Sequence, residues 1–549
     1  MKRIYLSILA LVSSLGIYAQ GEMDAIKLSR NDLRGTARSV AMGGAFGALG
    51  GDISGVAINP AGIGVYSSSE VVMTLNFQNT EMKSNLYGDK MDVSKFKFTC
   101  DNFALVTGID LMSDVVPRLN FGVSYNKIKS FDRKYKMRSS GPDGNGLNGS
   151  LIDYMAYRAN NMSGNPDLLL DNSQADDSKW NSYDWMGLFG YNGFLINEIG
   201  TGVYAPSLGM SADNELSVRE KGSINSYDFN VGTTISDIVS LGLTLSVTDI
   251  DYRMSSYYRE DFWGSVSDYS GYYDLFNSMK TEGAGFQVAL GTIIKPINEL
   301  RIGFAYHSPT FYNMTDYFYA DMEHDLSELQ GSVNQDIDPN YKPGYIASYG
   351  AGSGNNYSGW HGEYDYKLRT PDKFTFSLAG IIDNMAILSV DYDLINYKNM
   401  KLDDRYSGDN AISNSGVNSD IKNHFKMSSV LRLGAELRFT PQFSGRLGYS
   451  WVQSPLDKDF KDNKKEAMTV GSISHFTLDG DTNYFTWGLG YRFTKNFYTD
   501  VAFVVKNQKD YLYAFSNAYD EVRGVDIISD RATLKTTAFQ GLLTFGFRF

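Results

Sequence analysis

The carboxyl-terminal segment alternates between apolar and other residues with a period of two. One face of residues 534–549 carries Phe539, Gly541, Leu543, Phe545, Phe547 and Phe549, and the other carries Gln540, Thr544, Gly546 and Arg548. Residues 428–439 repeat the pattern, with Leu431, Leu433, Ala435, Leu437 and Phe439 on one face. A period of two predicts β-strands with one apolar face. Such strands occur in soluble sandwiches and in membrane barrels, and the alternation by itself fits both.

Candidate strands recur along the chain, and the lengths of their connections alternate. We expect about fourteen strands. They lie near 70–79, 95–109, 118–131, 222–235, 240–254, 282–295, 299–319, 363–381, 385–401, 425–439, 442–453, 483–493, 497–513 and 534–549. Short connections, such as 236–240, 296–298 and 440–442, alternate with long ones. Outer-membrane barrels have an even strand number, short periplasmic turns and long external loops. The sequence therefore predicts an all-β fold, a transmembrane antiparallel barrel at 69–549 with long external loops at 132–221 and 320–362.

The amino-terminal residues "MKRIYLSILALVSSLGIYAQ" have a basic start, an apolar middle and a small-residue cleavage site. This order is typical of a secretory signal peptide. The apolar run is too short for a membrane anchor helix and is interrupted by Ser7, Ser13 and Ser14. We therefore expect a signal peptide at 1–19 and a chain exported to the cell outer membrane of a Gram-negative bacterium as a multi-pass barrel.

Composition and charge exclude several classes of function. The net charge is −13, with acidic residues in loop-like stretches such as 171–179, which argues against nucleic acid as a partner. Cys100 is the only cysteine, so neither an internal disulfide nor a cysteine metal site can form. The five histidines lack metal-ligand spacing, and the glycine-rich residues 41–51 are not followed by the Gly-Lys-Ser/Thr of a phosphate loop. We expect no enzyme activity, catalytic residue, metal or cofactor.

Two strands show a change of parity in their apolar residues. In the second strand, Phe96 and Phe98 share one parity, whereas Phe103 and Leu105 take the other. The fifth strand changes parity between Val247 and Ile250. A one-residue slip indicates a bulge or a break in the wall, although the end of the membrane band also explains it.

The long loop 132–221 contains one segment with helical spacing. Within "GSLIDYMAYRANNMSG" (149–164), Leu151, Tyr154, Met155 and Arg158 fall on one helix face. This helix could cap the barrel mouth or offer an apolar landing site for a ligand, and the sequence leaves both open.

The segment before the first strand is rich in small residues and cannot build a core of its own. Its stretch "ARSVAMGGAFGALGGDISGVAINPAGIG" (37–64), with the quartet Asn59, Pro60, Ala61 and Gly62, resembles the amino-terminal hatch of the FadL/TodX family of outer-membrane hydrophobic-compound transporters. The stretch "LRLGAELRFTPQFSGRLGYSWVQSP" (431–455) looks like later strands of that family. The resemblance implies a monomeric 14-stranded barrel with a lumenal hatch at 20–68. It also implies uptake of long-chain fatty acids or aromatic hydrocarbons, which leave sideways through a wall opening.

Several arginines are expected to face the lumen near the periplasmic ends of their strands. They are Arg301, Arg432, Arg438, Arg446, Arg492 and Arg548. They could pair with acids of the hatch or of the lumen and hold the plug, or one could receive a fatty-acid carboxylate, because guanidinium matches carboxylate geometry. The terminal Phe549 resembles the signal read by the barrel-assembly machinery.

Two functions from different classes follow. The leading one is passive uptake of a hydrophobic small molecule, such as a long-chain fatty acid or an aromatic hydrocarbon, by a barrel embedded in outer-membrane lipid. The alternative is a FadL-shaped scaffold that binds other proteins, as in type IX secretion. An uptake channel needs an apolar pocket leading into the lumen, whereas a scaffold needs a sealed lumen and a large exposed loop surface.

Overall fold

A computed structural model describes residues 21–141, 147, 149–161, 184–207, 211–263, 270–327, 343–347, 362–383, 385–406, 412 and 415–549. The predicted signal peptide at 1–19 and parts of both predicted long loops lie outside these residues. The statements that follow concern the described ranges.

The protein forms one closed antiparallel barrel whose wall has 14 strands, as the sequence predicts. Some of these wall strands consist of two consecutive β-segments. In wall order they are β1 (Glu70–Leu86), β2 (Asp89–Asp110), β3 (Arg118–Ser130) with β4 (Arg133–Ser139), β7 (Ser211–Ile235), β8 (Val239–Trp263), β9 (Ser270–Ile297), β10 (Leu300–His307) with β11 (Phe311–Asp325), β14 (Lys373–Ile382) with β13 (Gly362–Arg369), β15 (Ala386–Asn396) with β16 (Lys401–Asp404), β17 (Met427–Arg438), β18 (Phe443–Val452), β20 (Thr482–Arg492) with β19 (Phe476–Leu478), β21 (Phe497–Tyr513) and β24 (Arg531–Arg548). The barrel closes because β1 pairs with β2 on one edge and with β24 on the other.

The outer face of the barrel is apolar. Large exposed side chains recur on alternate positions of neighbouring strands. They include Phe77, Phe103, Phe229, Phe539 and Phe545. No described helix is long and apolar enough to cross a membrane. An outer-membrane barrel has this arrangement: an apolar outer band on a closed sheet whose strands all pair with one another.

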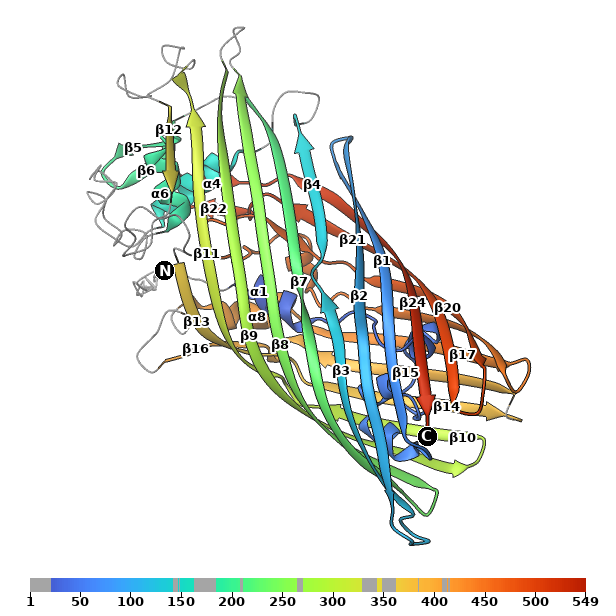
Figure 1. Cartoon of the computed structure of the whole chain (residues 1–549). Coiled ribbons are helices and arrows are strands. Elements are labelled where there is room, and N and C mark those ends of the chain that lie inside the picture. Colours follow the sequence, from blue (N-terminus) through green and yellow to red (C-terminus); the bar gives the residue numbers. More distant parts are fainter. Residues whose placement is uncertain are drawn as a thin grey trace, which may run out of the picture.

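The N-terminal segment, residues 21–68, lies inside the ring of strands (Figure 1). It contains α1 (Glu22–Ser29), α2 (Ala37–Ala41), α3 (Ile53–Val56) and the 3-10 turn η1 (Pro60–Val65). Its small residues allow close contact with the wall. A Cβ added at Gly448 of β18 would lie 2.1 Å from Gly43 N, and one added at Gly242 of β8 would lie 2.1 Å from Pro60 O. Residues with side chains would not fit at these contacts.

Folded loops cover the extracellular end of the lumen. They include α4 (Leu151–Asn160), α6 (Trp185–Asn192), η5 (Tyr397–Asn399), α8 (Val417–His424), α9 (Lys458–Lys461), β12 (Gly344–Ala347), and the hairpins β5 (Ile196–Gly200) with β6 (Val203–Pro206) and β22 (Ala518–Asp520) with β23 (Val525–Ile527). One apolar cluster runs from α1 through the inner faces of the strands to these loops. Leu151, Tyr154 and Met155 of α4 are buried in it, so this helix caps the mouth.

The two parity changes have different origins. In β2, the ladder to β1 skips Asp101, which is a β-bulge at the predicted position. The interpretation of a break in the fifth strand is wrong, because β8 pairs with β7 and β9 from Val239 to Trp263 without a register shift. Val247 faces outward and is 45% exposed, whereas Ile250 faces inward and is 3% exposed. The strand leaves the membrane band between them, and above it the apolar face is the inner one.

Candidate functional site

The barrel wall is interrupted between its second and third strands. The ladder between β2 and β3 ends at the pair Asn102 and Asn126, and the ladder between β3 and β7 is irregular at Lys127 to Lys129. Above this point β4 pairs with β7, and Ser84 of β1 donates to the carbonyl oxygen of Lys136. We call the boundary between residues 89–101 and residues 127–139 the wall seam. No backbone ladder pair joins its two sides in the described chain.

Side chains bridge the wall seam instead. Lys95 Nζ lies 2.8 Å from Asp132 Oδ1, and Lys97 Nζ lies 3.2 Å from Asp132 Oδ2. The bulge at Asp101 turns that carboxylate into the lumen, where Arg34 of the N-terminal segment donates to both its oxygens at 2.9 and 3.0 Å. The seam is therefore bridged by side-chain ion pairs and by the hydrogen bond of Ser84, and not by a ladder of backbone hydrogen bonds.

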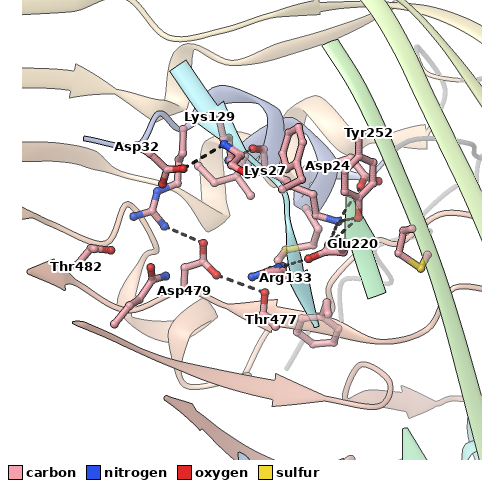
Figure 2. A pocket seen from close by; sticks show the side chains of 18 of the residues that line it. Asp24, Lys27, Asp32, Lys129, Arg133, Glu220, Tyr252, Thr477, Asp479 and Thr482 are labelled. Carbon is pink, nitrogen blue, oxygen red and sulfur yellow. Dashed lines mark hydrogen bonds and ion pairs between the residues drawn. The ribbon is translucent and has the colours of Figure 1, made fainter. Parts of the chain in front are cut away.

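A cavity of about 150 Å³ lies between α1, β3, β4 and the inner wall (Figure 2). One part of its lining is apolar, with Met23, Ile26, Met254, Met279, Leu456 and Phe476. It reaches the inner side of the wall seam, because Lys129, Ser130 and Phe131 also line it. The cavity therefore combines an apolar surface with the point where the wall is interrupted.

The polar part of the cavity contains mostly paired charges. Arg30 lies 2.8 Å from Asp479, and Lys506 lies 3.2 Å from Asp32. Arg133 pairs with Glu220, which also accepts a hydrogen bond from Tyr252 at 2.6 Å. Figure 2 labels Asp32, Asp479, Arg133, Glu220 and Tyr252 around the cavity.

Lys129 differs from the other cations of the cavity. Its ammonium donates to the backbone carbonyl of Lys27, and among the described residues no carboxylate lies within 4.0 Å of it. A carbonyl satisfies one of the three donors of an ammonium group. His475, in the adjoining loop, adds no charge, because burial lowers its pKa to about 3. Lys129 thus makes no ion pair within 4.0 Å among the described residues, and Asp32 and Asp479 are the carboxylates near enough to interact with it.

The hatch quartet lies away from the cavity. Asn59 accepts from Ala61 N at 3.1 Å and donates to Gly47 O at 2.6 Å and to Thr292 O of β9 at 3.1 Å. Pro60 begins η1, and Ala61 and Gly62 are buried within that turn. The quartet therefore fixes the N-terminal segment to β9 toward the periplasmic end, and it does not touch the wall seam.

The structure brings four of the six singled-out arginines together. Arg438, Arg446, Arg492 and Arg548 line one cavity of about 160 Å³ with Arg38 and Glu436. Arg446 lies 2.7 Å from Glu436 and 2.5 Å from Asp500, and Arg438 lies 3.4 Å from Glu436. Arg548 lies 2.7 Å from Glu70. These contacts form a charge network at the periplasmic end.

The other two arginines lie elsewhere. Arg432 pairs with Asp393 at 2.5 Å. Arg301 donates to Leu49 O at 2.5 Å and lines a separate cavity of about 400 Å³. The terminal Phe549 pairs through its backbone with Ser69 and is 62% exposed.

Sequence reasoning missed three arginines of the N-terminal segment. Arg30, Arg34 and Arg38 recur every four residues. They reach Asp479 in the loop after β19, Asp101 on β2 and Glu436 on β17. Their regular spacing before the glycine-rich stretch was the available signal. The N-terminal segment thus supplies the cations of three ion pairs that cross the lumen.

No protein-family model and no curated protein sequence matches the chain. Solved structures do. A Pseudomonas aeruginosa FadL homologue is 13% identical, with a TM-score of 0.49, and the match covers 94% of this chain and 99% of that one. The Pseudomonas putida toluene transporter TodX is 10% identical with a TM-score of 0.48, covering 94% and 99%. The Ralstonia pickettii toluene transporter TbuX is 14% identical with a TM-score of 0.43, covering 94% and 99%. By its own strand count, its closure and its lumenal N-terminal segment, the chain is an outer-membrane β-barrel similar in architecture to FadL and TodX.

Proposed function

We propose that the protein is a channel for passive uptake of hydrophobic molecules that carry one anionic group, with long-chain fatty acids as the substrate class. The observation that carries the proposal is the cavity behind the wall seam, where an apolar surface meets Lys129. A fatty acid offers an alkyl chain for the apolar lining and a carboxylate for the ammonium. A neutral aromatic hydrocarbon would use the apolar part and offer Lys129 no carboxylate.

The wall seam offers such a ligand a sideways route. Its sides are joined by Lys95 and Lys97 to Asp132, and the cavity reaches its inner face. Separation of these ion pairs would connect the cavity with the outer lipid layer. The N-terminal segment would act as the plug below, because its arginines pair with carboxylates on β2, on β17 and in the loop after β19.

The second candidate is the protein-binding scaffold. The folded loops over the mouth favour it, because α4 buries its apolar face and the hairpin β22 with β23 exposes Tyr519 and Val525. A sealed mouth with exposed apolar loop residues is what a docking platform requires.

Uptake by cells that make Lys129→Gln tests the proposal. A charge-assisted hydrogen bond contributes about 1.5–3 kcal/mol, so affinity for a fatty acid should fall roughly 10- to 100-fold. Uptake of the alcohol of equal chain length should be unchanged, because the alcohol has no carboxylate. The matched control is Lys401→Gln, since Lys401 pairs with Asp403 at 2.6 Å outside the cavity and the wall seam. Equal uptake of the acid by wild type and Lys129→Gln would remove the role of Lys129, and uptake by neither would favour the scaffold.

A further inference from the structure

The outer face of the wall carries two rows of cations above the apolar band. Lys221, Arg253 and Lys280 lie directly opposite one another on β7, β8 and β9. Lys509, Lys535 and Lys83 do the same on β21, β24 and β1. We call these sets the first and the second basic row. The same arrangement thus occurs twice around the barrel.

The cations of both rows point away from the lumen. Their neighbours along the strands, such as Tyr252, Met254, Met82 and Leu534, are buried in the inner apolar cluster. Side chains alternate between the two faces of a strand, so the cations face outward. The side chain of Arg253 is 57% exposed and that of Lys83 is 50% exposed, whereas that of Lys280 is 19% exposed.

Both rows lie above the membrane band. Tyr227, Val247 and Phe286 are exposed outward residues that come six positions below the first row on the same strands. Below the second row, the exposed Phe77 lies six positions from Lys83, and the exposed Phe539 lies four positions from Lys535. Six positions correspond to about 20 Å along a strand, or roughly 15 Å along the barrel axis at a tilt of about 40°. The headgroup layer of a phospholipid bilayer extends only about 5–8 Å beyond the hydrocarbon on each side. An anionic lipid that reaches the rows needs a longer headgroup.

Cations directly opposite one another on neighbouring strands destabilise a sheet. Nearby acids compensate three of the six: Arg253 lies 3.2 Å from Asp251, Lys280 lies 2.5 Å from Glu282, and Lys83 lies 2.8 Å from Glu81. Asp92 of β2 also lies opposite Lys83 in the ladder. Within the described ranges, Lys221, Lys509 and Lys535 have no acidic group within 4.0 Å. In a chain with a net charge of −13, both rows retain unpaired positive charge.

We propose that the two basic rows bind the phosphorylated sugar headgroups of glycolipids in the surrounding outer leaflet. Phosphate is the chemistry that such clusters of Lys and Arg bind, through charge-assisted hydrogen bonds. A sugar headgroup is long enough to bring phosphates to the height of the rows, and a lipid annulus meets both rows at once. The inference is independent of the proposed transport function, because the rows face away from the lumen.

Binding of purified lipopolysaccharide by the delipidated protein in detergent tests the proposal. The variants are Lys221→Gln/Arg253→Gln/Lys280→Gln and Lys83→Gln/Lys509→Gln/Lys535→Gln. Each should lose the glycolipid that binds its own row, and the combination of all six substitutions should weaken binding at least about tenfold at low salt, given the contribution of each cation near an anionic lipid surface. The control Lys401→Gln/Lys464→Gln/Lys495→Gln removes three lysines outside the rows and should bind like wild type. Dephosphorylated lipopolysaccharide should bind wild type as weakly as the native glycolipid binds the combined variant, and millimolar inorganic phosphate should not displace the glycolipid.

Thermal unfolding, followed by heat-modifiable migration, gives a second readout in two conditions. In detergent alone the row variants should unfold close to wild type, because the like-charge repulsion that is removed is offset by the lost ion pairs with Asp251, Glu282 and Glu81. With lipopolysaccharide, wild type should gain more stability than either variant. The proposal is overturned if the row variants bind like wild type, if the dephosphorylated glycolipid binds equally well, if inorganic phosphate competes, or if lipopolysaccharide stabilises wild type and variants equally.

Discussion

Arg34 is expected to hold the N-terminal segment in the lumen at the wall seam. Its side chain is 3% exposed, and its partner Asp101 is fully buried. Removing one partner of a buried ion pair costs about 3–5 kcal/mol. Asp101 keeps hydrogen bonds from Asn76 at 2.6 Å and Thr99 at 2.7 Å in Arg34→Ala, so the lower end applies. About 3 kcal/mol corresponds to a rise of roughly 100-fold in the population whose plug is displaced.

Single-channel conductance in planar bilayers measures that population, because a displaced plug admits ions. The open fraction of Arg34→Ala should exceed that of wild type by roughly 100-fold. Asp101→Asn, which keeps hydrogen-bonding atoms and loses the charge, should fall in between. The control Arg523→Ala removes an arginine that lies 2.6 Å from Asp520 in an external hairpin, and its open fraction should not change. Equal open fractions in folded wild type and Arg34→Ala would refute the reasoning, as would an equal rise in Arg523→Ala.

Three further variants test other parts of the account. Replacing Phe549 by Asp should impair assembly, visible as loss of heat-modifiable migration, whereas normal migration would argue against an assembly signal at this residue. Deleting residues 21–62 should leave a folded barrel, since the wall strands pair with one another, and its ion conductance should be higher. Unchanged conductance would mean that the segment is not a plug. Asn59→Ala/Pro60→Ala loses three hydrogen bonds of Asn59, about 1 kcal/mol each, and frees the turn. This variant should lower fatty-acid uptake at equal amounts of folded protein. Equal uptake would show that transport does not depend on the turn.

The sequence predicts the wall strands well because each must present an apolar outer face to lipid. The alternation ending at Phe549 and the short turns at 296–298 and 440–442 place β24, β10 and β18 correctly. The bulge at Asp101 is also visible as a parity change, since an extra residue shifts every later side chain to the other face. The similar change of parity in β8 wrongly indicates a break in the strand. There, the apolar residues face lipid in the lower part of the strand and face the core under the external loops in the upper part.

The contacts of the lumen are harder to predict. Arg34 and Asp101 are 67 residues apart, Arg38 and Glu436 are 398 apart, and Arg30 and Asp479 are 449 apart. Which carboxylate faces which arginine depends on the tilt and register of the whole barrel, and no local pattern encodes it. For the same reason, Lys129 carries no sequence signal that separates it from Lys127, the other lysine of its strand.

Entry of a labelled long-chain fatty acid into proteoliposomes, with the wall seam locked or free, tests the central claim most directly. In the variant Cys100→Ser/Lys97→Cys/Asp132→Cys, a bismaleimide linker can join the two sides of the seam, and its omission leaves the seam free. The account predicts energy-independent uptake by the unlinked protein and loss of most of that uptake after linking, with the barrel still folded. Undiminished uptake by the linked protein would contradict passage through the seam, and the absence of uptake by the unlinked variant and by wild type alike would contradict the transport function.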